Sequence, residues 1–227
     1  MIRVACVLKY GGDYDCEYVK SLYVVLNRYS HLPLELICLT DIASEVGKLG
    51  IQTQILEEDW PGWWSKMELF SLEGPVLYFD LDTAIVGDIR PLGDYITKLP
   101  DDEFLMLRGF YKNDPCSGIM GWNGDWSWMK EEFRTYVEFS GHFYKRAEHY
   151  ELACSVGQFR GDQNYIARSL GRVRMKITMA QDIMDGIYSY KVHIREKNRM
   201  PADAKIICFH GKPRPADADI SNLKAVI

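Results

Sequence analysis

The chain has 227 residues, of which 47% are hydrophobic, and a formal net charge of −5 at pH 7. This negative charge excludes the basic footprint of a nucleic-acid-binding protein, so we expect no nucleic-acid partner. A chain of this length buries roughly three quarters of the surface that its unfolded form exposes, which is enough for one domain with its own core. No apolar run approaches the roughly 20 residues of a membrane-spanning helix, so we do not expect an integral membrane protein.

The first residues and the cysteines indicate where the protein works. The apolar run over residues 1–8 is too short for a signal peptide and lacks a cleavage region, so we interpret it as a first strand. The six cysteines are scattered and include no Cys-x-x-Cys pair. Because a chain with this much core needs no disulfide framework, we expect a reduced, cytoplasmic setting.

The first quarter of the chain alternates between predicted strands and helices. Strands are expected over residues 3–9, 34–39 and 51–56. Apolar residues recur at helical spacing over residues 18–26, and a shorter helix is expected over residues 46–49. This β-α-β-α-β order predicts an α/β fold with a mostly parallel central sheet flanked by helices, of the Rossmann-like type that binds nucleotides.

A further helix leads into the next predicted strand. Ser65 and Glu68 match a capping box, which predicts a helix that starts at Lys66 and ends at a Gly-Pro pair. Lys66 would then lie at a helix N-terminus, where an anion binds favourably. The apolar run over residues 76–79 predicts a buried strand of a parallel sheet.

Two carboxylates, Asp80 and Asp82, follow this strand and are separated by Leu81. Side chains two positions apart on an extended chain point to the same side, so both carboxylates can face one site. Ligands of open α/β sheets gather at the carboxyl ends of the strands. Two carboxylates, completed by waters and a diphosphate, suit Mg²⁺ or Mn²⁺. The plain alternative is a pair of solvated aspartates at a turn.

Short strands and a turn are expected in the middle of the chain. The strands lie over residues 84–86, 104–107 and 119–122, and a turn over residues 114–118 leads into the last of them. Pro91 excludes a long helix after the first of these strands.

Two capped helices and a last strand complete the predicted domain. Asp125 and Asp162 are each expected at the start of a helix, as N-caps. The last strand is expected over residues 205–209. We therefore predict one domain over residues 1–215, followed by a polar C-terminal tail over residues 216–227.

Five short motifs occur in one order along the chain. They are Trp-Ser-Lys-Met-Glu-Leu-Phe at 64–70, the Asp-x-Asp strand and its continuation at 76–89, Cys-Ser-Gly-Ile-Met at 116–120, Gly-Asp-Gln-Asn at 161–164 and Phe-His-Gly-Lys-Pro at 209–213. Together they resemble the motifs of GT-A-fold glycosyltransferases, and are most similar to glycosyltransferase family 8, the glycogenin-like and bacterial lipopolysaccharide galactosyltransferase group. Each motif is weak alone, but their order and spacing cover nearly the whole chain.

The resemblance implies a metal-dependent hexosyltransferase. It would move a sugar from a nucleoside diphosphate donor, such as a UDP-sugar, to a glycan, lipid-linked or protein acceptor, with retention of configuration. Asp80 and Asp82, with His210 as the third protein ligand, would bind Mn²⁺ or Mg²⁺, which takes up charge as the nucleoside diphosphate leaves. Asp162 and Gln163 would approach the anomeric carbon and the acceptor, and Asp162 is the candidate base if the enzyme inverts.

The resemblance also implies which residues hold the donor. Lys66 and Lys212 would bind phosphate or sugar oxygens as point charges. The first strand and its turn would lie against the base and ribose, while Ser117 and Gly118 would line the sugar pocket. The full set of expected donor-binding residues is Val7, Lys9, Tyr10, Tyr14, Lys66, Leu81, Ser117, Gly118, Gly211 and Lys212.

The chain departs from the family pattern at three positions. Cys208 stands where the family places its metal-binding histidine, so His210 is expected to substitute from the same face of an extended strand. Arg214 stands where the family has a tryptophan, and Cys116 replaces an asparagine near the donor sugar. These changes leave the identity of the donor sugar open.

Other functions remain open on the sequence. A binding module could keep the nucleotide-sugar pocket without turnover. A haloacid-dehalogenase-type phosphatase would use the same acidic strand, but that class needs a threonine where this chain has Ala84. A sugar nucleotidyltransferase would need a basic phosphate loop after the first strand, where residues 10–13 are acidic. The loops over residues 108–116 and 140–160 are the candidates for reading the acceptor.

Overall fold

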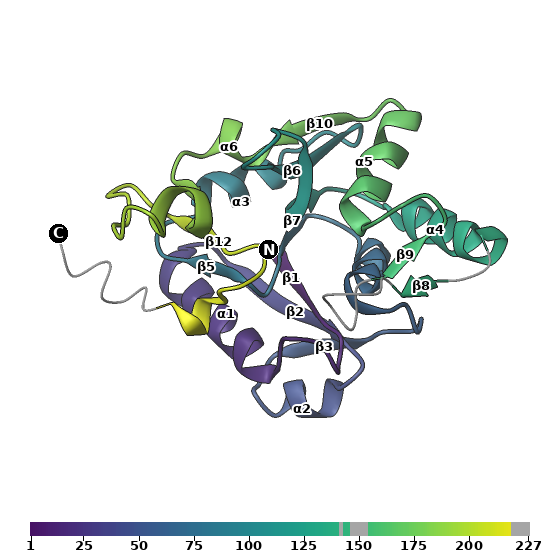
Figure 1. The fold of residues 1–227 in the computed structure, drawn as a ribbon, viewed down its shortest axis with the longest axis horizontal. Coiled ribbons are helices and arrows are strands. Elements are labelled where there is room, and N and C mark those ends of the chain that lie inside the picture. Colours follow the sequence, from purple (N-terminus) through teal and green to yellow (C-terminus); the bar gives the residue numbers. More distant parts are fainter. Residues whose placement is uncertain (141–142, 146–153, 219–227) are drawn as a thin grey trace.

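A computed structural model describes residues 1–140, 143–145 and 154–218 of the chain. A seven-stranded sheet in the order β10-β6-β7-β4-β1-β2-β3 runs through the centre (Figure 1). The strands β4, β1, β2 and β3 are parallel, whereas β7 is antiparallel to both of its neighbours. The expected mostly parallel sheet is therefore confirmed. Its strands are β1 (Ile2–Leu8), β2 (Leu34–Thr40), β3 (Gln52–Ile55), β4 (Val76–Phe79), β6 (Glu103–Arg108), β7 (Pro115–Trp122) and β10 (Lys176–Met179).

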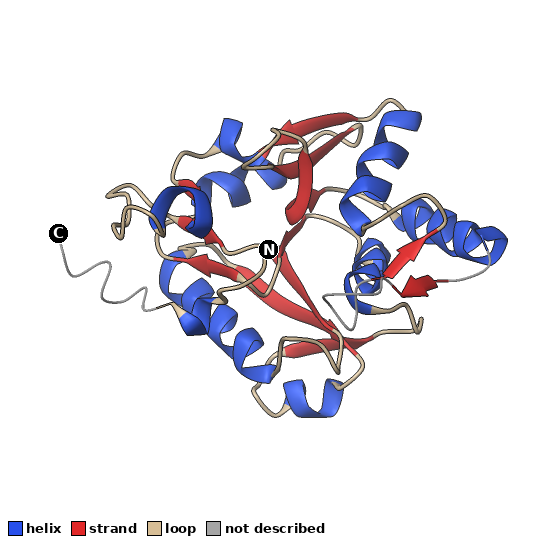
Figure 2. Ribbon diagram, viewed as in Figure 1, coloured by secondary structure: helices blue, strands red, loops and turns tan. Residues whose placement is uncertain are grey.

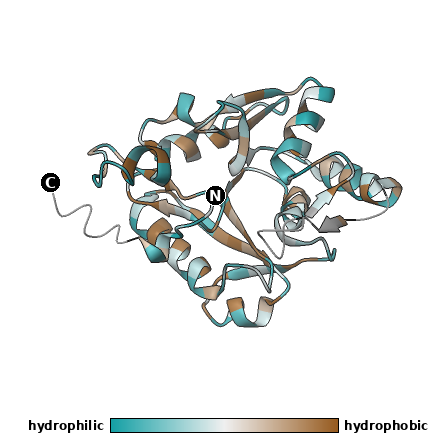
Figure 3. Ribbon diagram, in the orientation of Figure 1, coloured by the Kyte–Doolittle hydropathy of each residue, from teal (hydrophilic) through white to brown (hydrophobic). Residues whose placement is uncertain are grey.

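Helices cover both faces of this sheet (Figure 2). The helices α1 and α3 pack on one face, and η1, α4 and α5 pack on the other. The central strands are mostly hydrophobic along their length, while the helices carry hydrophilic residues on their outer sides (Figure 3). The helices are α1 (Cys16–Tyr29), α2 (Ala43–Gly47), η1 (Gly62–Ser71), α3 (Arg90–Ile96), α4 (Ser127–Ser140), α5 (Asp162–Arg172) and α6 (Ala180–Ile183).

The strand β4 shows why the sheet has two cores. All four of its residues are buried. Leu77 and Phe79 pack with α1 and α3, whereas Val76 and Tyr78 pack with the aromatic side chains of η1 and α4. Because successive side chains of a strand point to opposite faces, a strand between two helix layers needs an unbroken apolar run. That run ends at Asp80, which follows the carboxyl end of β4.

A second, three-stranded sheet brings the C-terminal part of the chain to the end of β4. It has the order β11-β12-β5, and β12 pairs with β5 in an antiparallel manner, with Cys208 opposite Thr83. The backbone N–H of Phe209 then donates to the backbone oxygen of Asp82 at 3.1 Å. These strands are β5 (Thr83–Ile85), β11 (Ile187–Ser189) and β12 (Ile206–Cys208). A short π-helix, η2 (Tyr190–Ile194), precedes β12 along the chain, and a short 3₁₀ helix, η3 (Pro215–Asp217), follows it.

Three local predictions are wrong. The helix that was expected from Lys66 is a tight 3₁₀ helix that begins at Gly62, and it has no capping box. The expected turn over residues 114–118 belongs to β7, which begins at Pro115. Asp162 is the first residue of α5, and Gly161 takes the N-cap position.

Two other regions lie partly outside the described residues. The stretch 140–160 contains the paired strands β8 (Phe143–Lys145) and β9 (Cys154–Val156). Residues 141–142, before β8, and residues 146–153, between the two strands, are not described. Of the predicted tail, residues 219–227 are not described. Among the helices of the described segments, none is both long enough and apolar enough to cross a membrane.

Candidate functional site

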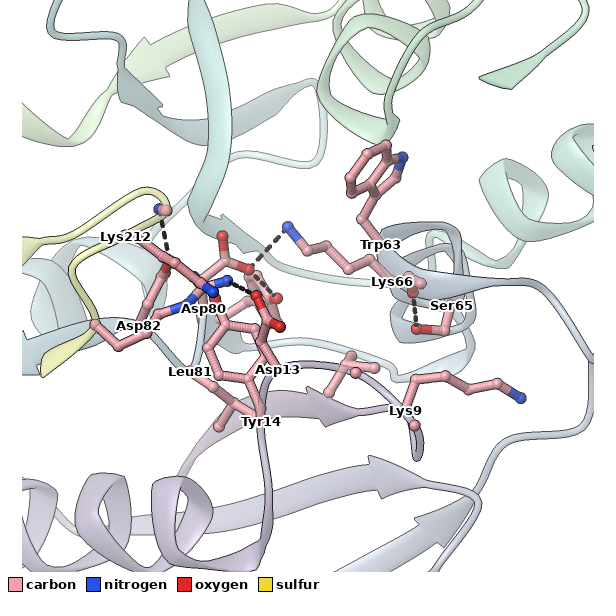
Figure 4. A pocket seen from close by; sticks show the side chains of 17 residues that line it. Lys9, Asp13, Tyr14, Trp63, Ser65, Lys66, Asp80, Leu81, Asp82 and Lys212 are labelled. Atoms are coloured by element: carbon pink, nitrogen blue, oxygen red, sulfur yellow. Dashed lines mark hydrogen bonds and ion pairs between the residues drawn. The ribbon is translucent and has the colours of Figure 1, made fainter. Parts of the chain in front are cut away.

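A pocket of about 810 Å³ opens at the carboxyl ends of β1 and β4 (Figure 4). Four segments line it: residues between 7 and 14, residues between 62 and 66 of η1, residues 78–82, and residues between 211 and 214. The segments 7–14 and 78–82 lie at the carboxyl ends of β1 and β4, which are neighbouring parallel strands. Their polar residues therefore meet at the same end of the sheet. The pocket is therefore where the expected site residues would meet, and most of them do.

Asp80 is held by a largely buried lysine, Lys66, whose side chain is 13% exposed. Lys66 reaches from η1 toward Asp80, and its Nζ lies 2.8 Å from Asp80 Oδ1 (Figure 4). The same Nζ lies 3.3 Å from Asp162 Oδ2, at the start of α5, and donates to Ser117 Oγ at 3.4 Å. Burial opposes the charge on Lys66, but Asp162 and Asp80 outweigh burial and keep the pKa of Lys66 above its ordinary value. Lys66 is thus a fixed cation that joins four elements.

Asp82 is more deeply buried than Asp80, with a side chain that is only 9% exposed. Its Oδ2 accepts hydrogen bonds from Tyr14 OH at 2.9 Å, the Gly211 N–H at 3.3 Å and Arg214 Nη1 at 2.9 Å. Burial, and then the charge of Asp80, raise the pKa of Asp82, although its three donors oppose this shift. The two carboxylates therefore repel one another at a site where added positive charge is favourable.

Arg214 ties the C-terminal segment to both the Asp-x-Asp motif and the first turn. Its Nη2 lies 2.6 Å from Asp13 Oδ2, and its Nη1 also contacts Tyr14 OH. The guanidinium carbon lies 4.4 Å from the centre of the Tyr14 ring, in a cation–π contact. The side chain is 11% exposed, and its Nε is buried without a hydrogen-bond partner among the described residues.

The carboxylates fit a divalent metal ion in part. Within the described residues, every side-chain hydrogen bond and ion pair of Asp80 and Asp82 is made by one carboxylate oxygen of each, Oδ1 of Asp80 and Oδ2 of Asp82. Asp80 Oδ2 and Asp82 Oδ1 remain as two hard oxygen ligands of the kind that Mg²⁺ and Mn²⁺ take, with water and diphosphate oxygens completing the shell.

His210 does not join this donor set in the structure. Its Nε2 lies 2.6 Å from Ser189 Oγ, and its ring stacks on Phe110 with 5.7 Å between centroids. The φ angle of His210 is 34°, so the chain turns here and the alternation of an extended strand, on which the prediction rested, is lost. No group of three or more His, Cys, Asp or Glu side chains suited to a metal occurs in the described part of the chain.

The other expected residues lie at varied distances from the pocket. Val7, Lys9, Tyr14, Leu81, Gly211 and Lys212 line it together with Lys66. The Asp80 N–H donates to the oxygen of Gly118 at 3.0 Å, because β7 runs antiparallel beside β4, and Gly118 thereby lies against the site. Tyr10 is 71% exposed and is not among the lining residues. Gln163 is half-buried in the first turn of α5.

Sequence reasoning missed Trp63 and Tyr78, which line the pocket, and it covered Asp13 only as part of the turn expected against the base and ribose. Trp63 could have been found, because it precedes Lys66 by three positions, and residues three apart share one face of a 3₁₀ helix. The misplaced helix start hid this relation. The Trp63 Nε1 is buried and has no hydrogen-bond partner in the described segments, so it is a donor available to a ligand.

Similar solved structures agree on the fold. No protein-family model and no curated protein matches the sequence. The structure of galactosyltransferase LgtC in complex with donor and acceptor sugar analogs matches with a TM-score of 0.59 and 11% identity, over 99% of this chain and 94% of that one. The apo-form glycosyltransferase GlyE of Streptococcus pneumoniae TIGR4 matches with a TM-score of 0.57 and 16% identity, over 94% of this chain.

The apo form of mouse xyloside xylosyltransferase 1 also matches, with a TM-score of 0.52 and 12% identity, over 93% of this chain and 98% of that one. The chain spans 55% of the GlyE chain, so part of GlyE has no counterpart here. At such low identities the likeness shows the fold alone. The fold expected from the five motifs, that of the GT-A glycosyltransferases, is confirmed.

Proposed function

We propose that this chain is a glycosyltransferase that moves a sugar from a nucleoside diphosphate donor, a UDP-sugar, to a hydroxyl of a glycan, lipid-linked or protein acceptor. The observation that carries the proposal is the meeting of Asp80, Asp82, Lys66 and Lys212 in one pocket, on a fold that solved glycosyltransferases share. A pocket of about 810 Å³ falls within the range of typical small-molecule sites, roughly 300–1,000 Å³.

Charge in the pocket favours a diphosphate. Four cationic side chains line it, those of Lys9, Lys66, Lys212 and Arg214, against three carboxylates. Lys212 is exposed and forms no ion pair with a described residue, so its ammonium group is available to phosphate oxygens. The diphosphate would therefore lie between Lys212 and the Asp-x-Asp motif.

A divalent ion, Mn²⁺ or Mg²⁺, would be held by Asp80 and Asp82 and would supply Lewis-acid stabilisation of the departing nucleoside diphosphate. Lys66 positions Asp80 by occupying its Oδ1, which leaves Oδ2 turned to other ligands. The Tyr14 hydroxyl and the Gly211 N–H do the same for Asp82 through its Oδ2. The structural role of these donors is to hold each carboxylate in one orientation.

Asp162 and Gln163 would face the transferred sugar. Asp162 is 6% exposed, and its Oδ2 makes an ion pair with Lys66 at 3.3 Å but no hydrogen bond within the described residues. An acceptor of this kind suits a sugar hydroxyl. Because Lys66 forms an ion pair with the Asp162 carboxylate, this carboxylate is not free to act as a general base. This arrangement fits retention, in which the leaving phosphate takes the acceptor proton.

The test is isothermal titration of UDP in the presence of Mn²⁺. We expect binding by the wild-type chain and a loss of roughly tenfold in the Asp80→Ala and Asp82→Ala variants, because each removes a charged ligand. Asp88→Ala is the matched control, since Asp88 pairs with Arg90 at the surface and lies outside the pocket. Absence of UDP binding, or equal binding by all variants, would overturn the proposal.

Turnover separates an enzyme from a non-catalytic binding module. A glycosyltransferase site without acceptor releases UDP slowly from its donor by hydrolysis, whereas a binding module does not. Release of UDP from a panel of UDP-sugars would show turnover and would also identify the sugar. Binding of UDP without any release would favour the binding module.

A further inference from the structure

We propose that Arg214 is a resident cation of the diphosphate subsite, so that nucleotide binding persists when the divalent ion is removed. The guanidinium would neutralise Asp82 and face the donor's phosphates. It would thereby supply positive charge that otherwise only the metal ion would provide. This inference rests on the proposed function, because its ligand is the nucleoside diphosphate of that reaction. It concerns a residue at which the chain departs from the family pattern.

Arg214 is fixed in place. Two carboxylates, Asp82 at 2.9 Å and Asp13 at 2.6 Å, hold its two terminal nitrogens, and the Tyr14 ring covers one face. Burial of an unpaired arginine would be strongly unfavourable, and two carboxylate partners offset this cost. The side chain is therefore part of the pocket wall and not a mobile surface group.

Arg214 also has capacity for a further anion. Its Nε is buried and has no hydrogen-bond partner in the described part of the chain, which is rare for a nitrogen at that depth. Arg214 lines the same pocket as Lys66 and Lys212. A guanidinium binds phosphate oxygens through paired N–H groups, in a geometry that a lysine or a tryptophan lacks.

Charge balance at the Asp-x-Asp motif supports this role. Lys66 pairs with Asp80 and Arg214 pairs with Asp82, so each acid of the motif already has a cation of the chain. A divalent ion that binds Asp82 Oδ1 would lie close to the guanidinium on Oδ2, and the two positive charges would repel. Arg214 therefore weakens metal binding while it strengthens phosphate binding.

A purely structural clamp is the alternative. Arg214 also ties residues 210–217 to the turn after β1, and loss of that tie would disturb the pocket wall. A clamp predicts that removal of Arg214 weakens UDP binding equally with and without metal. A resident cation predicts opposite changes: UDP binding without metal becomes weaker, and metal binding becomes tighter.

The experiment measures UDP affinity by titration calorimetry in EDTA and in Mn²⁺, for wild type, Arg214→Met and Arg214→Lys. We expect the wild-type Kd for UDP in EDTA to lie within about tenfold of its Kd in Mn²⁺. Arg214→Met should lose roughly 10- to 100-fold in EDTA, the worth of a charged hydrogen bond, and much less in Mn²⁺. Arg214→Lys should restore part of the loss, because it restores the charge without the paired N–H groups.

A second measurement follows the metal alone, by the electron paramagnetic resonance signal of free Mn²⁺. We expect Arg214→Met to bind Mn²⁺ more tightly than wild type, since Asp82 loses its competing cation. Arg90→Met is the matched control, because Arg90 pairs with Asp88 at the surface and both affinities should stay unchanged. Thermal unfolding of each variant checks that it is folded.

The outcomes separate the two proposals. If wild type binds UDP in Mn²⁺ but not in EDTA, the resident cation is refuted and the proposed function stands. If Arg214→Met loses the same factor in both buffers and binds Mn²⁺ no better, Arg214 is only a clamp and the inference is wrong. If wild type binds UDP in neither buffer, the proposed function itself fails. The wild-type comparison needs no variant, so it holds even if Arg214→Met does not fold.

Discussion

Replacement of Lys66 by methionine should destabilise the protein in a pH-dependent way. Lys66 is 13% exposed and lies between Asp80 and Asp162, whose side chains are 27% and 8% exposed. Removing one partner of a buried ion pair costs about 3–5 kcal/mol, because the remaining charge is left unpaired. Asp80 keeps some access to water and a hydrogen bond from Tyr78, so most of the cost comes from Asp162. We expect a loss of about 3 kcal/mol at pH 7.5.

The sign of the pH dependence follows from Lys66 itself. Burial lowers the pKa of Lys66, but Asp162 and Asp80 outweigh burial and raise it above the ordinary value of 10.5 in the folded state. The contribution of Lys66 is therefore fully present below pH 10.5 and is lost as the pH rises toward the higher folded value. The deficit of Lys66→Met is then largest at neutral pH and shrinks above pH 10.5.

Urea denaturation at pH 7.5 and at about pH 11 measures the deficit and its pH dependence. Lys20→Met is the control, because Lys20 pairs with Glu17 on the surface, at 51% and 70% exposure, and should cost less than about 1 kcal/mol. The double variant Lys66→Met with Asp162→Asn should be more stable than Lys66→Met alone, since no deeply buried charge remains unpaired. A deficit below about 1 kcal/mol, or one equal at both pH values, would refute this reasoning.

Two further predictions concern parts of the fold away from the pocket. Gly74→Ala should lower stability by about 1–3 kcal/mol, because a Cβ at Gly74 would lie 2.5 Å from the backbone Cα of Asn123, and thermal unfolding measures this. Glu103→Gln should lose about 1–3 kcal/mol at pH 7 through weaker bonds from Tyr95, Thr178 and Lys176. Burial raises the pKa of Glu103, but those donors outweigh burial and lower it, so the contribution is present above the ordinary value of 4.5 and lost as the pH falls through the lower folded value. Urea titrations at pH 7 and pH 3 should therefore show a smaller deficit at the lower pH, and an equal deficit at both would contradict this account.

The parts of the fold that sequence reasoning predicted well are those that local burial decides. The strand over residues 76–79 has the predicted bounds, because both of its faces are buried and the apolar run ends abruptly at Asp80. The helix start near Lys66 was misplaced because its two signal residues have other partners than those of a capping box. Ser65 Oγ donates back to the oxygen of Gly62, and the Glu68 carboxylate accepts the N–H groups of Glu57 and Glu58.

The candidate site was predictable where the residues lie on one strand or its immediate continuation. The two acids of the motif do line one pocket, but the chain turns between them, with the Thr83 N–H donating to the oxygen of Asp80 at 3.0 Å, so the extended chain on which the prediction rested is absent. The contact between Arg214 and Asp82 joins positions 132 apart, and nothing in the local pattern of either segment indicates it. For His210, a single backbone turn moved the side chain toward Ser189, and a motif comparison that assumes an extended chain does not detect such a turn.

Asp82 accepts bonds from residues 209–214 through both its backbone and its side chain, across 127 or more positions of the chain. Contacts of such long range form late, because the intervening chain must first be ordered. On a translating ribosome, the helices and strands up to residue 200 would thus emerge with an unfinished pocket. The arrival of β12 and of residues 211–214 would complete the pocket wall, so ligand affinity would appear in one step once these residues have emerged.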